Sequence, residues 1–311
     1  MRVLVTGGAG FIGSNLVHAL VGSHEVGVID DLSTGHAENL HPAAWNRTMD
    51  ILDELLPAAF AEFAPDAVVH LAAQSSVPRS IVDPVRDWAV NVDGTSRVAA
   101  AAAAAGARRV LSASSAAVYG EPAEIPLKEG SPTVPVNPYG SSKLAAETAL
   151  AEQLSARGVD YASFRFSNVY GPRQDSQGEG GVVAIFCSEL AADRVPIIHG
   201  SGAQTRDFIY VADVVAAIVS ALEFDGRLAD GGPSGPAYNI STGEEVSING
   251  LANAMRQVAG FFAPYESATE RAGDVMRSSL DPAKAYQTFG WRSVVPLDSG
   301  LGPTFRWFAR S

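Results

Sequence analysis

Tyr139 and Lys143 are the residues whose types and spacing first indicate chemistry. They stand four positions apart in Tyr139-Gly140-Ser141-Ser142-Lys143. Four residues make about one helical turn, so both side chains lie on one face of a predicted helix. A free phenol has a pKa of about 10 and is a poor base at neutral pH, but a nearby ammonium favours the phenolate. The pair therefore indicates proton transfer by Tyr139, assisted by Lys143.

A hydroxyl partner for this pair is expected on the loop that follows the predicted strand 109–113. The chain reads Ser114-Ser115-Ala116-Ala117-Val118-Tyr119-Gly120 at this place. A serine hydroxyl there can hydrogen-bond a substrate oxygen while Tyr139 moves its proton. A tyrosine–lysine pair can also be an ordinary surface pair on a helix, so the interpretation depends on the rest of the chain.

The first thirty residues predict a dinucleotide-binding turn. An apolar run at 3–5 leads into Gly8, Gly10 and Gly13 in the pattern GxGxxG, and Asp30 follows twenty positions after Gly10. Glycines at this spacing allow a tight turn, let the backbone approach a pyrophosphate and let the helix pack close to the strand. The pyrophosphate then lies at the positive end of the helix that begins near Phe11.

Asp30 also selects the cofactor. A carboxylate at this position accepts hydrogen bonds from the adenosine ribose hydroxyls and repels a 2′-phosphate. The following residues 31–34 include no arginine or lysine that could bind such a phosphate. The sequence therefore favours NAD over NADP.

These residues require a parallel sheet to position them. The order of apolar runs and helical segments predicts strands at 3–5, 25–29, 67–71, 109–113 and 161–166, and helices from Phe11, over 83–105 and over 139–157. Alternating strands and helices predict an α/β fold, a Rossmann-type doubly wound parallel sheet, with ligands beyond the carboxyl ends of the strands. We expect a smaller C-terminal substrate-binding lobe. The NAD-binding domain is expected to comprise 1–167 and roughly 207–256, and the lobe roughly 168–206 and 257–311.

Composition excludes several classes of function. The 311 residues carry a formal charge of -12, which argues against a nucleic-acid or anionic-membrane partner. Cys187 is the single cysteine, so neither an internal disulfide nor a cysteine metal cluster is expected. The histidines lack metal-ligand spacing, and no metal site is expected; His70 is expected to be a core histidine. No signal peptide or membrane-spanning stretch is predicted, which favours the cytoplasm.

The motifs together resemble a known family. The chain is similar to the extended short-chain dehydrogenases/reductases of the NAD-dependent epimerase/dehydratase family, and most similar to its UDP-glucose 4-epimerases. The resemblance runs nearly end to end. It is carried by TGGAGFIGSNL, HLAAQ, NVDGT, SSAAVYG, PYGSSK, RFSNVYGPRQ, RDFIYVADV, YNISTG and RAGDV.

The resemblance implies roles for individual residues. Ser115 corresponds to the catalytic Ser/Thr, Tyr139 to the base and Lys143 to the ribose-binding lysine. The implied NAD contacts are Gly7, Gly10, Phe11, Ile12, Asp30, Asp31, Ser33, Thr34, Gly35, Asp50, Ile51, Leu71, Ala72, Ala73, Gln74, Asn91, Tyr139, Lys143 and Phe166. The implied substrate contacts are Ser115, Tyr139, Asn168, Val182, Arg206, Arg271 and Asp274. Arginine suits a diphosphate because its planar fork offers paired donors.

Departures from sister groups favour one reaction. Dehydratases of the family carry an Asp-Glu pair directly after the catalytic hydroxyl, and nucleotide-sugar decarboxylases usually carry a Glu there. Ala116 and Ala117 occupy these positions, and alanine transfers no proton. The expected function is 4-epimerisation of a UDP-hexose of the UDP-glucose/UDP-galactose type through a 4-keto intermediate, with Tyr139 as the base.

Other readings stay open from the sequence. A UDP-glucuronate 4-epimerase is the first alternative, although Asp175 stands where uronate enzymes tend to carry an arginine. A UDP-GlcNAc 4-epimerase remains possible because Ser278 is small. A carbonyl reductase and a non-catalytic dinucleotide sensor are the remaining candidates. The resemblance also implies a homodimer through a four-helix bundle of the 83–105 and Tyr139 helices. The small lobe is expected to be packed by Trp291, Phe305, Trp307 and Phe308.

Overall fold

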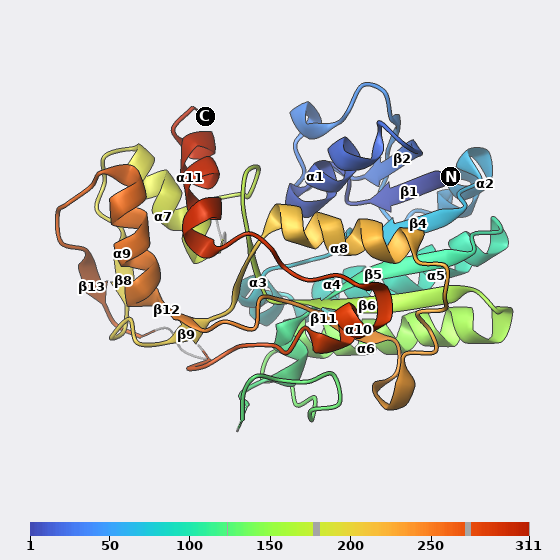
Figure 1. Ribbon diagram of the computed structural model, residues 1–311. Coiled ribbons are helices and arrows are strands. Elements are labelled where there is room, and N and C mark those ends of the chain that lie inside the picture. Colours follow the sequence, from blue (N-terminus) through green and yellow to red (C-terminus); the bar gives the residue numbers. More distant parts are fainter. Residues whose placement is uncertain (123, 177–180, 271–274, 311) are drawn as a thin grey trace.

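A seven-stranded parallel sheet forms the centre of the molecule in the computed structural model (Figure 1). The structure describes residues 1–122, 124–176, 181–270 and 275–310. The strands of the central sheet are β1 (Arg2–Thr6), β2 (Glu25–Asp30), β3 (Trp45–Thr48), β4 (Ala67–His70), β5 (Arg109–Ser115), β6 (Asp160–Phe166) and β11 (Ala237–Ile240). Their order is β11-β6-β5-β4-β1-β2-β3, and every neighbouring pair is parallel. The predicted Rossmann-type sheet is confirmed.

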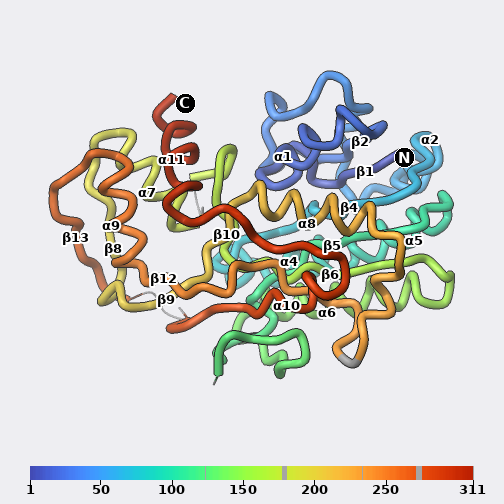
Figure 2. Tube along the Cα trace, in the orientation of Figure 1, coloured from blue at the N-terminus to red at the C-terminus, as the bar shows by residue number. Residues whose placement is uncertain are grey.

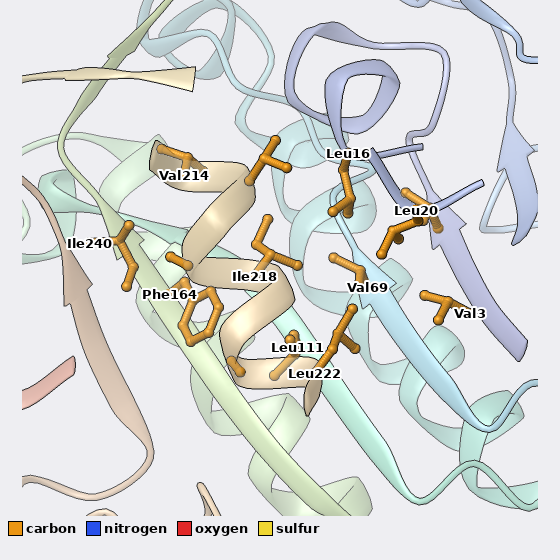
Figure 3. Packing of buried hydrophobic residues seen from close by; sticks show 14 of the residues in the cluster. Val3, Leu16, Leu20, Val69, Leu111, Phe164, Val214, Ile218, Leu222 and Ile240 are labelled. Atoms are coloured by element: carbon orange, nitrogen blue, oxygen red, sulfur yellow. The ribbon is translucent and has the colours of Figure 1, made fainter. Parts of the chain in front are cut away.

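Helices cover both faces of this sheet because its strands are apolar on both sides. Along β1, Val3 and Val5 belong to one core, whereas Leu4 belongs to the other. The first core lies under α1 (Phe11–Leu20) and α8 (Val211–Glu223) (Figure 3). The second core lies under α2 (Leu56–Phe63), α5 (Gly94–Ala104) and α6 (Pro138–Leu154).

The strand order reverses between β1 and β4. The chain runs outward from β1 through β2 to β3 and then returns to place β4 on the other side of β1. The loops after β1 and β4 therefore leave the sheet side by side and in opposite directions. Parallel α/β sheets bind ligands at such a point, outside the carboxyl ends of the strands.

The helix predicted over 83–105 is interrupted. It consists of α4 (Pro84–Trp88), a π-helical turn over Ala89–Asp93 and α5. The backbone N–H of Gly94 donates to the carbonyl of Ala89, five residues back. Asn91 lies inside this turn and is buried. A short helix α3 (Val77–Val82) precedes α4.

A smaller lobe lies beside the sheet, at the left of Figure 1, and the chain trace passes into it several times (Figure 2). Its helices are α7 (Val182–Ala191), α9 (Ile248–Ala259) and α11 (Leu297–Phe308), which share one apolar core. Its strands are β8 (Ile197–His199), paired with β13 (Glu266–Ala268), and β9 (Thr205–Arg206), paired with β12 (Val246–Ser247). We propose that the lobe includes all of α9, because this helix packs on α7 and α11. The remaining division into two domains stays a prediction.

Several passages of the chain join the lobe to the sheet. Strand β7 (Asn168–Tyr170) follows β6 in the chain, and strand β10 (Phe208–Tyr210) precedes α8. The two strands pair in parallel. Helix α10 (Ala283–Phe289) packs on β11.

Trp291 does not pack the lobe as expected: it belongs to the first sheet core, and its indole N–H donates to the Asp213 carbonyl at 2.9 Å. Among the described residues, no helix is both long and apolar enough to cross a membrane.

Candidate active site

The turn after β1 is shaped by two glycines at which a side chain would clash with neighbouring backbone. Gly7 has a φ of +73°, and a Cβ there would lie 2.6 Å from the Ala72 nitrogen in the loop after β4. A Cβ on Gly13 would lie 2.0 Å from the carbonyl oxygen of Gly7. The first glycine allows a left-handed turn and the second allows α1 to approach it closely. At these two positions the turn therefore presents bare backbone.

This bare turn leads into a helix end suited to a phosphate. Helix α1 begins at Phe11, with Gly10 at its N-cap, and no described side chain caps it. The first N–H groups of a helix, here those of Phe11 and Ile12, have no intrahelical acceptor. Together with the helix dipole they form a site for an anion such as a pyrophosphate.

Asp30 lies at the carboxyl end of β2, next to the same turn. Its carboxylate accepts hydrogen bonds from the Ala9 N–H at 2.9 Å and the Leu32 N–H at 2.8 Å. Burial raises the pKa of Asp30, and these two backbone bonds oppose the rise. Each carboxylate oxygen can accept further bonds, so Asp30 can still hold ribose hydroxyls. The observed turn and acid fit a dinucleotide.

The loops after β2 and β3 contribute further predicted cofactor contacts. Asp31 accepts bonds from the N–H and the hydroxyl of Ser33, at 2.9 and 2.6 Å, which folds the segment containing Thr34 and Gly35. Asp50 accepts from the Leu52 N–H and pairs with Arg86 at 3.2 Å, and Ile51 is buried. These side chains lie along the carboxyl edge of the sheet, where the prediction places the adenosine.

Asn91 ties the loop after β4 to the helix of the tyrosine. The loop contains Leu71, Ala72, Ala73 and Gln74. The Asn91 side chain accepts from the Gln74 N–H and donates to the Gln74 carbonyl, both at 3.0 Å, and donates to the Ser142 hydroxyl at 3.0 Å. The π-helical turn turns this amide inward, and so it joins three segments.

Tyr139 and Lys143 lie in the first turns of α6, as their spacing predicts. Asn137 caps the helix by accepting from the Gly140 N–H at 2.8 Å. The Lys143 ammonium donates to the Ala113 carbonyl at 3.1 Å and lies 6.0 Å from the centre of the Tyr139 ring. Ser115, the last residue of β5, accepts from the Ala117 N–H at 3.2 Å. The structure thus brings α6 to the end of β5.

Burial sets the ionisation of these groups. It lowers the pKa of Lys143 to about 8, against the opposing charges of Asp87 and Glu147. It raises the pKa of Tyr139, which a hydrogen bond with Ser115 lowers in part and the charge of Asp87 raises further. Perturbed groups in mutual contact at a strand edge are typical of catalytic sites.

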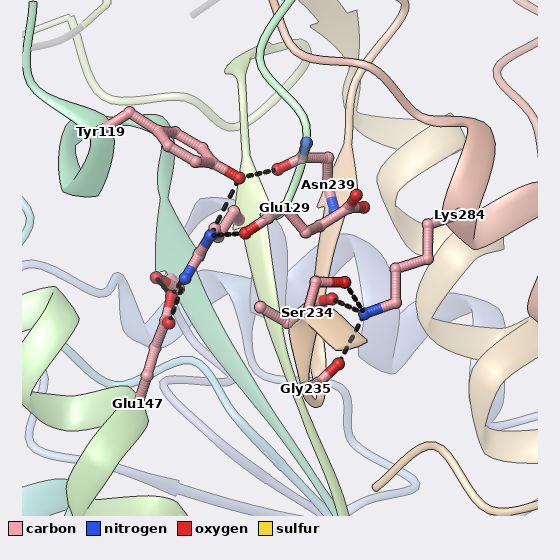
Figure 4. A network of polar contacts seen from close by, with 10 residues as sticks. Tyr119, Glu129, Glu147, Ser234, Gly235, Asn239 and Lys284 are labelled. Carbon is pink, nitrogen blue, oxygen red and sulfur yellow. Dashed lines mark hydrogen bonds and ion pairs between the residues drawn. The ribbon is translucent and has the colours of Figure 1, made fainter. Parts of the chain in front are cut away.

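The sequence interpretation missed a buried ion pair between α6 and β6 (Figure 4). Glu147, one turn after Lys143, accepts from Arg165 of β6 at 2.9 and 2.7 Å and from the Ser114 hydroxyl at 2.6 Å. Arg165 also donates to the Tyr119 hydroxyl at 2.9 Å. The network fixes α6 against the strand that ends in Ser115. In the sequence, Arg165 stands out only as part of the motif RFSNVYGPRQ. The spacing of four residues from Lys143 is the one sequence feature that places Glu147 on the same helix face.

His70 and the predicted substrate contacts take separate places. His70 is a core histidine, as expected: its ring lies between the hydroxyls of Thr6 and Thr95 at 2.7 and 3.0 Å. Phe166 ends β6 within the first core, Asn168 begins β7 with an exposed side chain, and Val182 begins α7. Arg206 in β9 donates to the carbonyls of Thr205 and Val275 at 2.8 and 2.6 Å. Arg271 and Asp274 lie outside the described residues.

Comparison with known proteins agrees with this geometry. The sequence profile of the "NAD dependent epimerase/dehydratase family" matches residues 3–241. A UDP-glucose 4-epimerase of Mycolicibacterium smegmatis is 44% identical over 317 aligned positions, which cover 99% of this chain and 98% of that protein.

Two solved structures are similar over the full length. One is a UDP-glucose 4-epimerase of Thermotoga maritima with UDP-glucose, with a TM-score of 0.94, 36% identity and coverage of 100% and 99% of the two chains. The other is a Thermus thermophilus UDP-glucose 4-epimerase in complex with NAD, with a TM-score of 0.90, 38% identity and 99% coverage of both chains. By its sequence profile, its full-length relatives and its fold, this chain belongs to the NAD-dependent epimerase/dehydratase family.

Proposed function

We propose that this protein is an NAD-dependent UDP-glucose 4-epimerase, which interconverts UDP-glucose and UDP-galactose. The observation that carries the proposal is that Tyr139, Lys143 and Ser115 meet at the carboxyl end of β5, in the sheet whose strand β1 ends in a turn suited to a dinucleotide. The end-to-end similarity to UDP-glucose 4-epimerases supports the choice of substrate.

NAD would lie across the crossover of the sheet. The turn from Gly7 to Ile12 would hold its pyrophosphate, Asp30 its adenosine ribose, and Lys143 its nicotinamide ribose. When bound, NAD supplies reversible hydride acceptance at the sugar C4. Since the hydride returns to the same sugar, the reaction causes no net oxidation.

The residues of the chain move the proton and hold the oxygen. Tyr139 as phenolate takes the proton of the C4 hydroxyl, and Ser115 hydrogen-bonds the same oxygen. The 4-keto sugar then turns about its link to the diphosphate and presents its other face, and Tyr139 returns the proton to the oxygen of the inverted alcohol. Lys143 favours the phenolate because its positive charge lies near the ring.

The substrate contacts that the family resemblance implies would anchor the nucleotide while the hexose turns. We assign this role to Asn168, Val182, Arg206, Arg271 and Asp274. A nucleotide held by arginine and a hexose held by few polar groups suits a sugar that must rotate. Ala117, whose N–H donates to Ser115 and which stands where dehydratases and decarboxylases carry an acid, offers no second proton donor.

The test is an epimerisation assay with the purified protein. UDP-galactose, UDP-glucuronate and UDP-GlcNAc are supplied in parallel with NAD, and the products are separated by chromatography. We expect conversion of UDP-galactose to UDP-glucose, and a Tyr139→Phe variant should bind NAD but lose at least about a hundredfold in kcat. Tyr286→Phe, which alters an exposed tyrosine of α10, is the matched control. Full activity of Tyr139→Phe would refute the assigned base.

We further propose a cytoplasmic homodimer. Four apolar side chains of α3 and α4 are exposed beside α6: Ile81, Val82, Val85 and Trp88. A second copy that packs its own α4 and α6 there would cover them, in the four-helix arrangement that the family resemblance implies. Sedimentation velocity should give a dimer and, for Val85→Glu, a monomer. Val294→Glu, at an equally exposed valine, should remain dimeric.

A further inference from the structure

Asp87 is a buried carboxylate that the mechanism above does not use. It lies in α4 and is 1% exposed. Its Oδ1 accepts from the Gln74 side-chain amide at 2.6 Å and from the Asn91 amide at 3.3 Å. Buried carboxylates are rare, and one that is hydrogen-bonded only to neutral amides is expected to act on charges nearby.

Its two partners belong to the segments that join the cofactor loop to α6. Gln74 also donates to the Ser76 carbonyl at 2.8 Å and accepts from the Ser76 N–H at 2.6 Å, which closes the loop on itself. Asn91 binds the Gln74 main chain on one side and Ser142 of α6 on the other. Asp87 accepts from both amides and thereby fixes their orientation.

The charge of Asp87 acts on the catalytic pair. It raises the pKa of Lys143, whose burial lowers it, and it raises the pKa of Tyr139. The other groups that face Lys143 are Glu147 on its own helix, which acts in the same direction, and His70 of β4, which is held neutral with a pKa of about 3 by its burial.

The charged groups next to Asp87 on the surrounding elements point elsewhere. Arg86 of α4 pairs with Asp50, and Arg79 of α3 is exposed. Among the described residues, Asp87 forms no ion pair of its own, so its electric field acts on the helix that carries Tyr139 and Lys143.

We propose that Asp87 is a positioning residue of this enzyme: through Gln74 and Asn91 it fixes the cofactor loop against α6, and its carboxylate supplies a buried negative charge that acts on the Tyr139–Lys143 pair. This inference rests on the proposed epimerase function for its kinetic readout alone. The two roles are separable. An amide in place of the Asp87 carboxylate can still accept the hydrogen bonds that hold the loop, but it carries no charge that could change the pKa values of Tyr139 and Lys143.

The experiment compares Asp87→Asn with the unsubstituted enzyme and with Asp93→Asn. Asparagine keeps an oxygen that accepts from Gln74 and Asn91 but removes the charge. Asp93 is exposed in the same helical segment, so its substitution removes an equal charge from the surface. The pH dependence of kcat with UDP-galactose is measured for each protein. The ionisation of Tyr139 is followed by ultraviolet absorption, as the difference between each protein and the same protein with Tyr139→Phe added.

Asp87→Asn should move both limbs of the kcat profile and the tyrosinate transition to lower pH, by about one pH unit. Asp93→Asn should leave both unchanged. A loss of kcat with no displacement along the pH axis, or superimposable titrations, would overturn the proposal. If no variant epimerises UDP-galactose but the tyrosinate transition still moves, the proposed function fails and the role of Asp87 stands.

Discussion

Replacing Glu147 by methionine should destabilise the fold strongly, because it leaves the Arg165 guanidinium buried without its counter-charge. The two side chains are 13% and 6% exposed and share two hydrogen bonds of 2.9 and 2.7 Å. Removing one member of such a pair costs about 3–5 kcal/mol. The Tyr119 hydroxyl and the Glu129 carbonyl remain as neutral acceptors for Arg165, but neither carries the opposing charge.

Urea unfolding at a fixed free NAD concentration measures this cost, since bound ligand also stabilises the native state. A loss of about 3–5 kcal/mol is a large part of the roughly 5–15 kcal/mol that holds a typical fold together. The double variant Glu147→Met/Arg165→Met should recover much of the loss, because it removes both charges and leaves apolar groups of similar length.

An exposed ion pair supplies the control. Glu189 and Arg194 of the lobe also share two hydrogen bonds, of 2.6 and 3.0 Å, but their side chains are 32% and 59% exposed. Solvent screens such a pair, so Glu189→Met should leave the unfolding midpoint nearly unchanged. Equal midpoint shifts for Glu147→Met and Glu189→Met would refute the reasoning that burial makes the first pair costly to break.

Three further predictions follow from the site. Burial lowers the pKa of His70 to about 3. Below pH 6.5 the unfolded chain therefore binds a proton that the folded chain does not, and the free energy of unfolding decreases as the pH is lowered. His70→Asn should reduce the loss of unfolding free energy between pH 7 and pH 5 by about 2 kcal/mol, measured by urea unfolding at both values. Gly13→Ala places a methyl 2.0 Å from the Gly7 carbonyl, so it should cost about 1–3 kcal/mol of stability and weaken NAD binding in fluorescence titrations. Asp30→Asn should weaken NAD about tenfold and reduce the preference over NADP, because it loses charge-assisted bonds to the ribose; unchanged affinities for both cofactors would contradict that role.

Local patterns predicted the sheet well. The apolar runs and the glycine turn of the first thirty residues correspond to β1, α1 and β2, and the YxxxK spacing corresponds to two side chains in neighbouring turns of α6. These features depend on short-range rules: strand burial, tight turns and helical period. The helix expected at 139–157 ends in a 3-10 turn at Ser155–Arg157, a difference of one turn.

Features that depend on contacts between distant residues were not predictable in the same way. Strand β3 reads as polar and has three exposed residues, because it lies at the edge of the sheet. Trp291 packs the sheet core through a contact with Asp213 that lies 78 positions away. Asp87 and Arg165 look like ordinary surface charges in the sequence, and their burial follows only from the assembled layers.

The π-helical turn at Ala89–Asp93 restricts how this protein can change in length. Such a turn holds one more residue than the α-helix it interrupts, so deleting one residue within it would restore regular winding and leave the following helix in phase, whereas a deletion inside α5 would rotate everything after it by about 100°. After a deletion of that second kind ahead of them, Ala99 and Ala102 of α5, now fully buried, would face away from the second core. Loss of the extra residue would therefore spare the packing of α5 and cost the inward placement of Asn91, which joins Gln74 to Ser142.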